Sequence, residues 1–321
     1  MTTKTTTKKT SARKTSTRKS KTSSAPKTSA KRTRSSLDRR VIAILYRPQT
    51  PLAVQKAVEL ALWLREQGST VLTAPGQNLG RDIKHVTEKD LDRLDLVVVL
   101  GGDGTYLGAV RMLGHHAVPV LGINMGSLGF LTQTRVEDMF NTVIATLANK
   151  MDFRARSMLA IEIRRKGKVR NEYIALNDAV LERGSITHLI NLEIHVEDHL
   201  VGEVKADALI VGTPTGSTAY NLAAGGPVLH PDTRSIVVTP VCPHALTSRP
   251  LIFPDDQRLK FQITQKDKNA ILTVDGAPSG VITYEDEVWI TRSAIDHITV
   301  CKPAHNFFQL LREKLKFGER N

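Results

Sequence analysis

A strand of the buried type runs directly into a glycine-rich turn between residues 97 and 105. The residues VVVL at 97–100 are followed by GGDGT at 101–105. Glycines adopt positive φ easily and let backbone N–H groups approach an anion closely. A carboxylate in such a turn repels phosphate, so we expect Asp103 to handle a proton or a metal ion while N–H groups hold the phosphate oxygens. The pattern favours phosphoryl transfer to a hydroxyl over simple nucleotide binding; the alternative is a tight turn in which Asp103 only caps the next helix.

Hydrophobic periodicity on either side of this turn alternates between strand and helix. It predicts strands at 41–45, 70–73, 97–100 and 118–123, and helices at 51–68, 105–113 and 136–150. This order is typical of an open α/β sheet, in which ligands bind at the carboxyl ends of the strands.

The periodicity changes after residue 153 to short alternating segments separated by turn residues. These predict strands at 159–164, 173–181, 192–196, 259–263, 271–274, 288–290 and 298–300, followed by a helical segment at 307–316. We therefore expect four regions. They are a basic tail at 1–39, an α/β domain with GGDGT at 40–150, a β-rich domain at 151–302, and a C-terminal segment at 303–321 that packs back on the body.

The formal net charge of +13 comes from residues 1–40 alone. Residues 1–40 hold 14 of the 45 Lys and Arg and one acid, Asp38, which leaves 31 basic and 31 acidic residues for the rest of the chain. A segment made almost entirely of Thr, Ser, Lys, Arg and Ala cannot bury enough apolar surface to fold. We expect a solvated appendage that the core activity does not need; the alternative is an arm that contacts nucleic acid or acidic surfaces nonspecifically.

The chain shows no sign of a membrane segment or of a metal site of its own. No run of 18 apolar residues and no secretory h-region occur. Cys242 and Cys301 are far apart without a CxxC pattern, which is typical of reduced thiols in a cytoplasmic protein. His195 and His199 have the spacing of a metal pair, but alternation at 192–196 predicts a strand, where positions four apart lie about 13 Å from each other. One ion cannot bridge that distance.

Three further polar motifs follow predicted strands. NMGSLGFLT at 124–132 suggests a loop beside GGDGT, although a simple connector would look similar. Asn177 and Asp178 are adjacent polar residues in an apolar strand, so they need partners or a ligand such as a sugar hydroxyl, unless they mark a β-bulge. The run 207–220, DALIVGTPTGSTAY, leads from a strand into a hydroxyl-rich loop that can surround a nucleotide. No GxxxxGK[ST] motif is present, so no P-loop lysine holds that nucleotide.

In this order the motifs closely resemble those of the NAD kinase family. The resemblance covers about residues 41–308 and includes TSRPLIFP at 247–254 and VDG at 274–276. GGDGT alone is shared with diacylglycerol and sphingosine kinases and, loosely, with phosphofructokinases, whereas the whole succession is specific to NAD kinases. The implied fold is an open α/β domain of the phosphofructokinase and diacylglycerol kinase kind, followed by a β-sandwich-like domain, with the active site between them.

The resemblance implies ATP-dependent phosphorylation of NAD at the 2′-hydroxyl of the adenosine ribose, which gives NADP. Asp103 would be the general base, accepting the hydroxyl proton late, as the bond to phosphorus forms. Mg²⁺, carried mainly by the phosphates, would neutralise charge on the leaving group. Family members are homo-oligomers, so a dimer or tetramer is expected.

Matching the family's motifs position by position gives the residues expected at the dinucleotide. Asn177 and Asp178 would hold the NAD, and Lys205 would supply a cation for its pyrophosphate. Asp207 and residues 218–223 would line the adenine and ribose pocket. The family usually has a glutamine where this chain has Ala277, so an amide contact is expected to be lost there. The full set is Asp103, Gly104, Asn177, Asp178, His188, Lys205, Asp207, Thr218, Ala219, Tyr220, Asn221, Leu222 and Ala223.

Two alternatives for the function are weighed against this resemblance. A GGDGT lipid kinase needs an apolar acceptor pocket, and the hydroxyl-rich loop at 213–220 argues against one. A noncatalytic dinucleotide sensor that reports through the basic tail needs no base, and the intact Asp103 argues against it.

Overall fold

The computed structural model describes residues 1–2, 39–185, 188–303 and 306–316. The predicted tail at 1–39 therefore lies almost entirely outside the described residues. The described residues from 39 onward form one compact unit, and it contains all the helices and strands given below. None of the described helices is long and apolar enough to cross a membrane.

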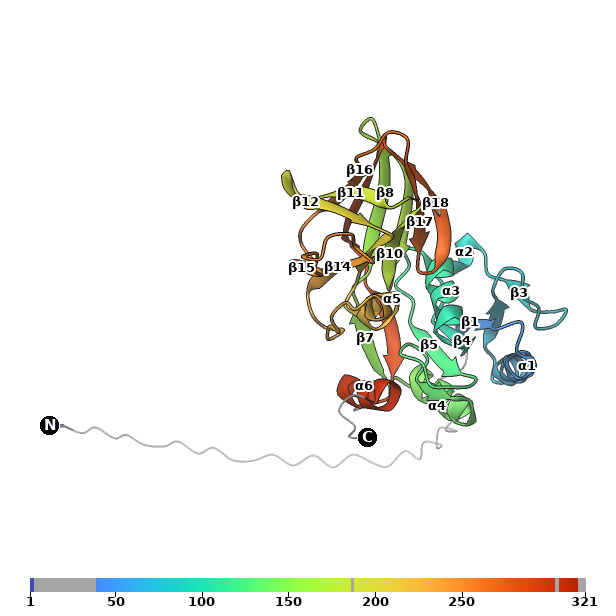
Figure 1. The fold of residues 1–321 in the computed structure, drawn as a ribbon. Helices are drawn as coiled ribbons and strands as arrows, with labels where there is room; N and C mark the ends of the chain where they lie inside the picture. The colour runs from blue at the N-terminus through green and yellow to red at the C-terminus, as the bar shows by residue number, and fades with distance from the viewer. Residues whose placement is uncertain (3–38, 186–187, 304–305, 317–321) are drawn as a thin grey trace, which may run out of the picture. The chain divides into compact units, whose positions relative to one another are not determined.

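An eight-stranded sheet forms the first part of the fold (Figure 1). Its strands lie in the order β3-β2-β1-β4-β5-β20-β7, with β6 beside β5. Neighbours are parallel, except that β7 is antiparallel to β20. The chain steps outward from β1 to β3 and returns to the other side of β1 with β4, which creates a topological switch point between β1 and β4. The bounds are β1 Val41–Tyr46, β2 Thr70–Thr73, β3 Lys84–His85, β4 Leu96–Gly101, β5 Val120–Asn124, β6 Thr134–Arg135, β7 Asp152–Arg156 and β20 His297–Cys301.

Helices cover both faces of this sheet because its central strands are apolar on both sides. From β1, Ile42 and Ile44 pack in one cluster with α1 and α4, whereas Ala43 and Leu45 pack in another with α2 and α3. α1 begins at Pro51, since the fixed φ and missing N–H of proline suit the first turn of a helix. The bounds are α1 Pro51–Glu66, α2 Glu88–Leu91, α3 Asp103–Leu113 and α4 Met139–Leu147, the last preceded by the 3-10 turn η1 at Val136–Asp138.

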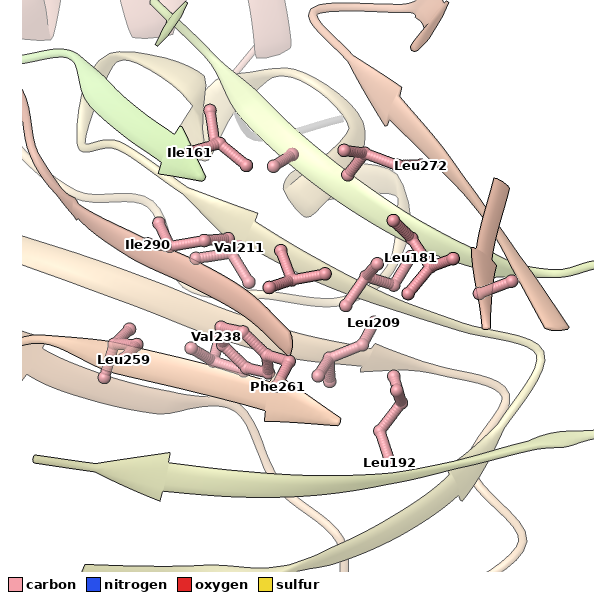
Figure 2. Close-up of a cluster of buried hydrophobic side chains, with 14 of the residues drawn as sticks. Ile161, Leu181, Leu192, Leu209, Val211, Val238, Leu259, Phe261, Leu272 and Ile290 are labelled. Carbon is pink, nitrogen blue, oxygen red and sulfur yellow. The ribbon is translucent and has the colours of Figure 1, made fainter. Parts of the chain in front are cut away.

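Two six-stranded antiparallel sheets form the second part of the fold. Their orders are β15-β14-β13-β10-β17-β18 and β12-β11-β16-β19-β8-β9. Leu181 and Leu209 from the first sheet and Phe261 from the second meet in one apolar cluster (Figure 2). The bounds are β8 Leu159–Arg165, β9 Lys168–Ala175, β10 Asp178–Arg183, β11 Ile190–Val196, β12 His199–Ala206, β13 Ala208–Gly212, η2 Thr215–Thr218, α5 Tyr220–Ala223, β14 Ser235–Val241, β15 Leu251–Pro254, β16 Leu259–Ile263, β17 Asn269–Val274, β18 Ala277–Thr283, β19 Asp286–Arg292 and α6 Phe307–Leu315.

The structure confirms the predicted α/β part followed by a β-sandwich part, with two differences in the α/β part. The strand predicted at 298–300 was expected among the β-rich elements, but as β20 it pairs with β5 and β7. Alternation reveals a strand but not its partner, because pairing depends on residues far away in the chain. The helix predicted at 105–113 begins at Asp103, so Asp103 and Gly104 lie in its first turn. A carboxylate is favoured there by the helix dipole.

Two further differences concern the sandwich. The single strand predicted at 173–181 is broken into β9 and β10, because the N–H groups of Leu176 and Asn177 donate to the carboxylate of Asp275. His195 and His199 do not share a strand, since His199 begins β12 after a two-residue turn. The spacing of about 13 Å expected for one strand therefore does not apply to them.

A buried polar cluster joins α3 to β20. The hydroxyl of Tyr106 lies 2.8 Å from Nε2 of His297 and donates to Oγ1 of Thr299 at 3.0 Å. Tyr106 is fully buried and His297 is only 4% exposed. Burial lowers the pKa of His297 to about 3, and the nearby cation Arg156 lowers it too. The imidazole is therefore neutral in the folded protein.

We expect this buried histidine to make the fold sensitive to mild acid. The folded pKa of about 3 lies below the ordinary value of about 6.5, so between these pH values the unfolded chain binds a proton that the folded chain does not. Stability is then complete above the unfolded pKa and falls as the pH falls towards the folded one. From pH 7 to pH 5, His297 alone should lower the free energy of unfolding by about 2 kcal/mol.

Urea denaturation at the two pH values measures this loss. His297→Asn should lose less stability than the wild type over the same interval, whereas His115→Asn, at an exposed histidine, should match the wild type. An equal loss in His297→Asn and the wild type would contradict the assignment.

Candidate active site

A cavity of about 1110 Å³ lies at the carboxyl ends of β1, β2 and β4. This is the edge of the sheet at its switch point, where open α/β sheets bind ligands. The walls come from the loops at 46–49 and 74–77, from the GGDGT turn, and from the face of α3 between Gly104 and Arg111. The volume suits a ligand of nucleotide size.

Asp103 lies at the start of α3, and its carboxylate is held by the loop after β5. Oδ1 accepts hydrogen bonds from the N–H groups of Leu131 and Thr132 and from the Thr132 hydroxyl, at 3.0–3.1 Å. Oδ2 accepts the N–H of Phe130 at 2.8 Å. A Cβ added at Gly129 would lie 2.1 Å from Oδ1, so glycine permits this close approach. The two predicted glycine loops therefore meet at the Asp103 carboxylate.

This anchoring leaves Asp103 able to act on a substrate. Oδ2 accepts one hydrogen bond from the protein, and a carboxylate oxygen has two lone pairs. Asp103 and Gly104 both line the cavity. The first N–H groups of a helix have no partner inside the helix and attract anions. A phosphate at the start of α3 and a hydroxyl at Oδ2 can therefore lie side by side.

Asn177 and Asp178 lie at the start of β10 and are both buried, with 8% and 5% exposure. Asp275, in the turn between β17 and β18, accepts their N–H groups at 2.8 Å and 3.1 Å. Burial raises the pKa of Asp178 to about 7, and the negative charge of Asp275 raises it as well. Burial also raises the pKa of Asp275, which the backbone N–H groups counteract. Near neutral pH Asp178 is thus partly protonated and can donate to or accept from a sugar hydroxyl.

The hydroxyl-rich loop after β13 packs on this segment. Thr213 donates its N–H to the Asn177 carbonyl at 2.8 Å. Farther along, Thr218 lines a small cavity of about 40 Å³ together with Phe130. Phe130 also donates its N–H to Asp103, so the residue that anchors the Asp103 carboxylate borders the same small cavity as Thr218 of this loop.

The run predicted at 218–223 is exposed unevenly. Tyr220 is 44% exposed, but Asn221 is fully buried. The Asn221 amide donates to the carbonyls of Ser217 and Pro227, and its oxygen accepts from the Thr239 hydroxyl. The polar atoms of this side chain are therefore used to shape the loop. The other members are half-buried at Thr218, Ala219 and Leu222, and exposed at Ala223.

Three predicted residues, His188, Lys205 and Asp207, lie at the other end of β10. That strand runs from Asp178 to Arg183, a span of about 17 Å. Arg183 pairs with the Asp207 carboxylate at 2.8 Å and lines a cavity with His188. Lys205 is exposed on β12, two residues before Asp207. One chain therefore does not bring these three residues next to Asp178.

The sequence interpretation assigns no role to two parts of this site. The loops at 46–49 and 74–77 line the large cavity, but their sequences YRPQ and APGQ carry no recognisable ligand motif. Asp275 appears in the sequence only as part of VDG, although an acid before a glycine is a signal for a hairpin turn. Ala277 lines a cavity beside Arg111, and its methyl group cannot supply the amide that a glutamine would.

Two family models match the chain. The ATP-NAD kinase N-terminal domain matches residues 42–151, and the ATP-NAD kinase C-terminal domain matches residues 176–300. Together they cover the glycine-rich turn, the start of β10 and the hydroxyl-rich loop.

Relatives that align with most of the chain belong to the same family as these two models. NAD kinase from Bdellovibrio bacteriovorus is 53% identical, covering 87% of this chain and 93% of that protein, and NAD kinase from Geobacter sulfurreducens is 36% identical, covering 87% and 99%. Yeast NADH kinase complexed with NADH is 28% identical with a TM-score of 0.82, covering 88% and 89%. An NAD kinase from Archaeoglobus fulgidus in complex with ATP, 21% identical with a TM-score of 0.67 and covering 85% and 99%, supports the fold. The chain belongs to the ATP-NAD kinase family.

Proposed function

We propose that this protein transfers the terminal phosphoryl group of ATP to the 2′-hydroxyl of the adenosine ribose of NAD, giving NADP. The observation that carries the proposal is the Asp103 carboxylate. Four hydrogen bonds fix it at the wall of a nucleotide-sized cavity, and one oxygen can still accept a proton. Family membership identifies the substrates, and the relatives described above do not support a lipid kinase.

In this mechanism ATP occupies the large cavity with its phosphates at the start of α3. Backbone N–H groups and the helix dipole stabilise the phosphate charge there. Asp103 accepts the hydroxyl proton as the new P–O bond forms, and ADP leaves with the electron pair of the broken P–O bond. Because Oδ1 already accepts three hydrogen bonds, Oδ2 is the atom that receives the proton.

A divalent cation fits this cavity as a partner of the nucleotide. Mg²⁺ is usually held by one or two carboxylates together with substrate phosphates, and both Asp103 and Glu88 line the cavity. The described residues contain no group of three or more His, Cys, Asp or Glu that would form a separate metal site. Mg²⁺ bound to ATP would lie near Asp103 and Glu88 and would neutralise phosphate charge there.

The acceptor site requires a second copy of the chain. Asn177 and Asp178 hold the ribose hydroxyls of NAD at one end of β10, while Lys205 and Asp207 lie about 17 Å away at its other end. The strand between them is buried from Asp178 to Leu181, so a dinucleotide cannot lie along it. In a homo-oligomer, Lys205 and Asp207 of a second copy complete the site.

The proposed location is the cytoplasm. Cys242 and Cys301 are free thiols, as expected in a reducing compartment. Burial raises the pKa of the Cys301 thiol, which keeps it protonated and unreactive.

Replacing Asp103 by asparagine should remove the base and leave NAD binding in place. We expect kcat for NADP formation to fall by about 10²- to 10⁴-fold, with the Kd of NAD within about threefold of the wild type. A coupled assay with an NADP-specific dehydrogenase measures kcat, and calorimetry measures Kd. Wild-type rates in Asp103→Asn would remove Asp103 from the mechanism.

A donor-by-acceptor matrix on the wild type tests the substrates themselves. The donors are ATP and polyphosphate, and the acceptors are NAD, NADH and diacylglycerol. We expect NADP from NAD and ATP and no phosphorylated lipid. Absence of NADP, with NAD still bound, would favour a dinucleotide sensor and overturn the proposed activity.

The anchoring of Asp103 can be tested without changing the carboxylate. Gly129→Ala places a Cβ 2.1 Å from Oδ1, so the loop must shift and Asp103 loses its position. We expect kcat to fall by at least about tenfold. Gly126→Ala is the matched control in the same loop, because nothing lies within 4 Å of its added Cβ. Equal rates in the two variants would argue against the anchor.

A site shared between copies predicts complementation. Asp103→Asn and Asp207→Asn should each be impaired, but their mixed dimer contains one site with both native residues. Co-expressed or exchanged subunits should recover about a quarter of the wild-type rate if they mix at random. No recovery despite exchange shown by sedimentation or mass measurement would place both residues at the same copy's site.

A further inference from the structure

We propose that Asp275 is a positioning residue that fixes the Asn177–Asp178 segment for the dinucleotide. This inference rests on the proposed function, because it takes that segment as the part that holds NAD. The reaction described above gives Asp275 no role of its own. Its carboxylate acts on the substrate through the backbone of another segment.

The carboxylate of Asp275 accepts three successive backbone N–H groups. Oδ2 accepts from Leu176 at 2.8 Å, and Oδ1 accepts from Asn177 at 2.8 Å and from Asp178 at 3.1 Å. In return, the N–H of Asp275 donates to the Asp178 carbonyl at 2.9 Å. These four hydrogen bonds tie the β17–β18 turn to the start of β10.

These hydrogen bonds determine the path of the chain before β10. β9 ends at Ala175 and β10 begins at Asp178, so Leu176 and Asn177 lie outside both strands. Successive N–H groups converge on one anion only where the backbone curves. All three donors belong to buried residues, and buried donors without an acceptor are unfavourable. Without the carboxylate the segment must therefore rearrange.

The β17–β18 turn suits an aspartate for a second reason. Asp275 and Gly276 have φ of +46° and +73°, values that Asn, Asp and Gly adopt most readily. An aspartate at this position satisfies the backbone of the turn and also supplies the carboxylate that the neighbouring segment needs.

The turn is also held from the first part of the fold. Arg111 of α3 donates to the carbonyl of Asp275 at 3.4 Å, and Figure 1 shows the hairpin of β17 and β18 beside α3. Arg111 lines the cavity assigned to ATP as well. The helix that begins with Asp103 therefore contacts the residue that shapes the NAD-binding segment.

Asp275→Asn tests the carboxylate while preserving the turn, because asparagine also adopts positive φ. An amide has one acceptor oxygen, so its NH₂ group must face at least one of the three donors. We expect the KM for NAD to rise by at least about tenfold while the KM for ATP stays within about threefold. Steady-state kinetics with each substrate varied in turn measures this split. Equal rises in both KM values, or a loss of kcat alone, would overturn the proposal.

Glu197→Gln is the matched control. Glu197 also has positive φ, at +51°, in the β11–β12 turn, and it accepts one backbone N–H, that of Arg258, at 2.9 Å. It should retain wild-type kinetics. If Asp275→Asn does not fold, Asp275→Glu keeps the charge and displaces it by one methylene group, and the same split between the two KM values is expected. Circular dichroism melting verifies the fold of each variant.

A double variant tests whether Asp275 acts through the segment. The increases in the KM for NAD caused by Asp275→Asn and Asn177→Ala should combine to less than their product, because both changes affect one structural unit. Fully multiplicative effects would overturn the positioning role. A wild-type protein that forms no NADP would instead overturn the proposed function, so the two failures are distinguishable.

Discussion

The candidate site depends on the Asp103 carboxylate, which accepts hydrogen bonds from backbone N–H groups of a loop far away in the sequence. Asp103 stands at the start of α3, and its oxygens accept from three successive residues, Phe130 to Thr132. Charge-assisted hydrogen bonds replace the water that a half-buried carboxylate loses. The same contact aligns the loop after β5 with the glycine-rich turn after β4. The proposed base and the wall of its cavity are therefore fixed by a single group.

Asp275 is a second aspartate whose carboxylate accepts backbone N–H groups of a distant segment, but its position gives it a different role. Both aspartates accept three successive N–H groups, and both join segments that are far apart in the sequence. Asp103 lines the large cavity and keeps capacity to accept from a substrate. Asp275 directs its carboxylate to the backbone, and its charge helps to raise the pKa of Asp178. In the proposed mechanism one carboxylate accepts the proton, and the other holds the residues proposed to bind the acceptor.

The sequence predicts those parts of the fold that local periodicity determines. The strand before GGDGT, the helix after it and the strand that leads into Thr213 are confirmed within a few residues. The break between β9 and β10 at Leu176 and Asn177 cannot be recognised in the sequence. The apolar alternation continues through these two residues, although their N–H groups donate to Asp275 and not to a neighbouring strand. The sheet that β20 joins depends on long-range pairing. The hydrogen bonds of the buried Asn221 amide likewise involve three partners that the local sequence pattern does not predict.

A motif names residues that meet a ligand, but it does not say which copy of the chain supplies each of them. Asp178 lies at one end of β10, whereas Asp207 pairs with Arg183 at the other end of this strand. Two edge strands of the sandwich also expose apolar side chains, Leu200 and Val201 on β12 and Leu251 and Ile252 on β15. Exposed apolar edges favour association with another chain. The division of the predicted residues and the exposed apolar edges both support the proposal that a second copy completes the acceptor site.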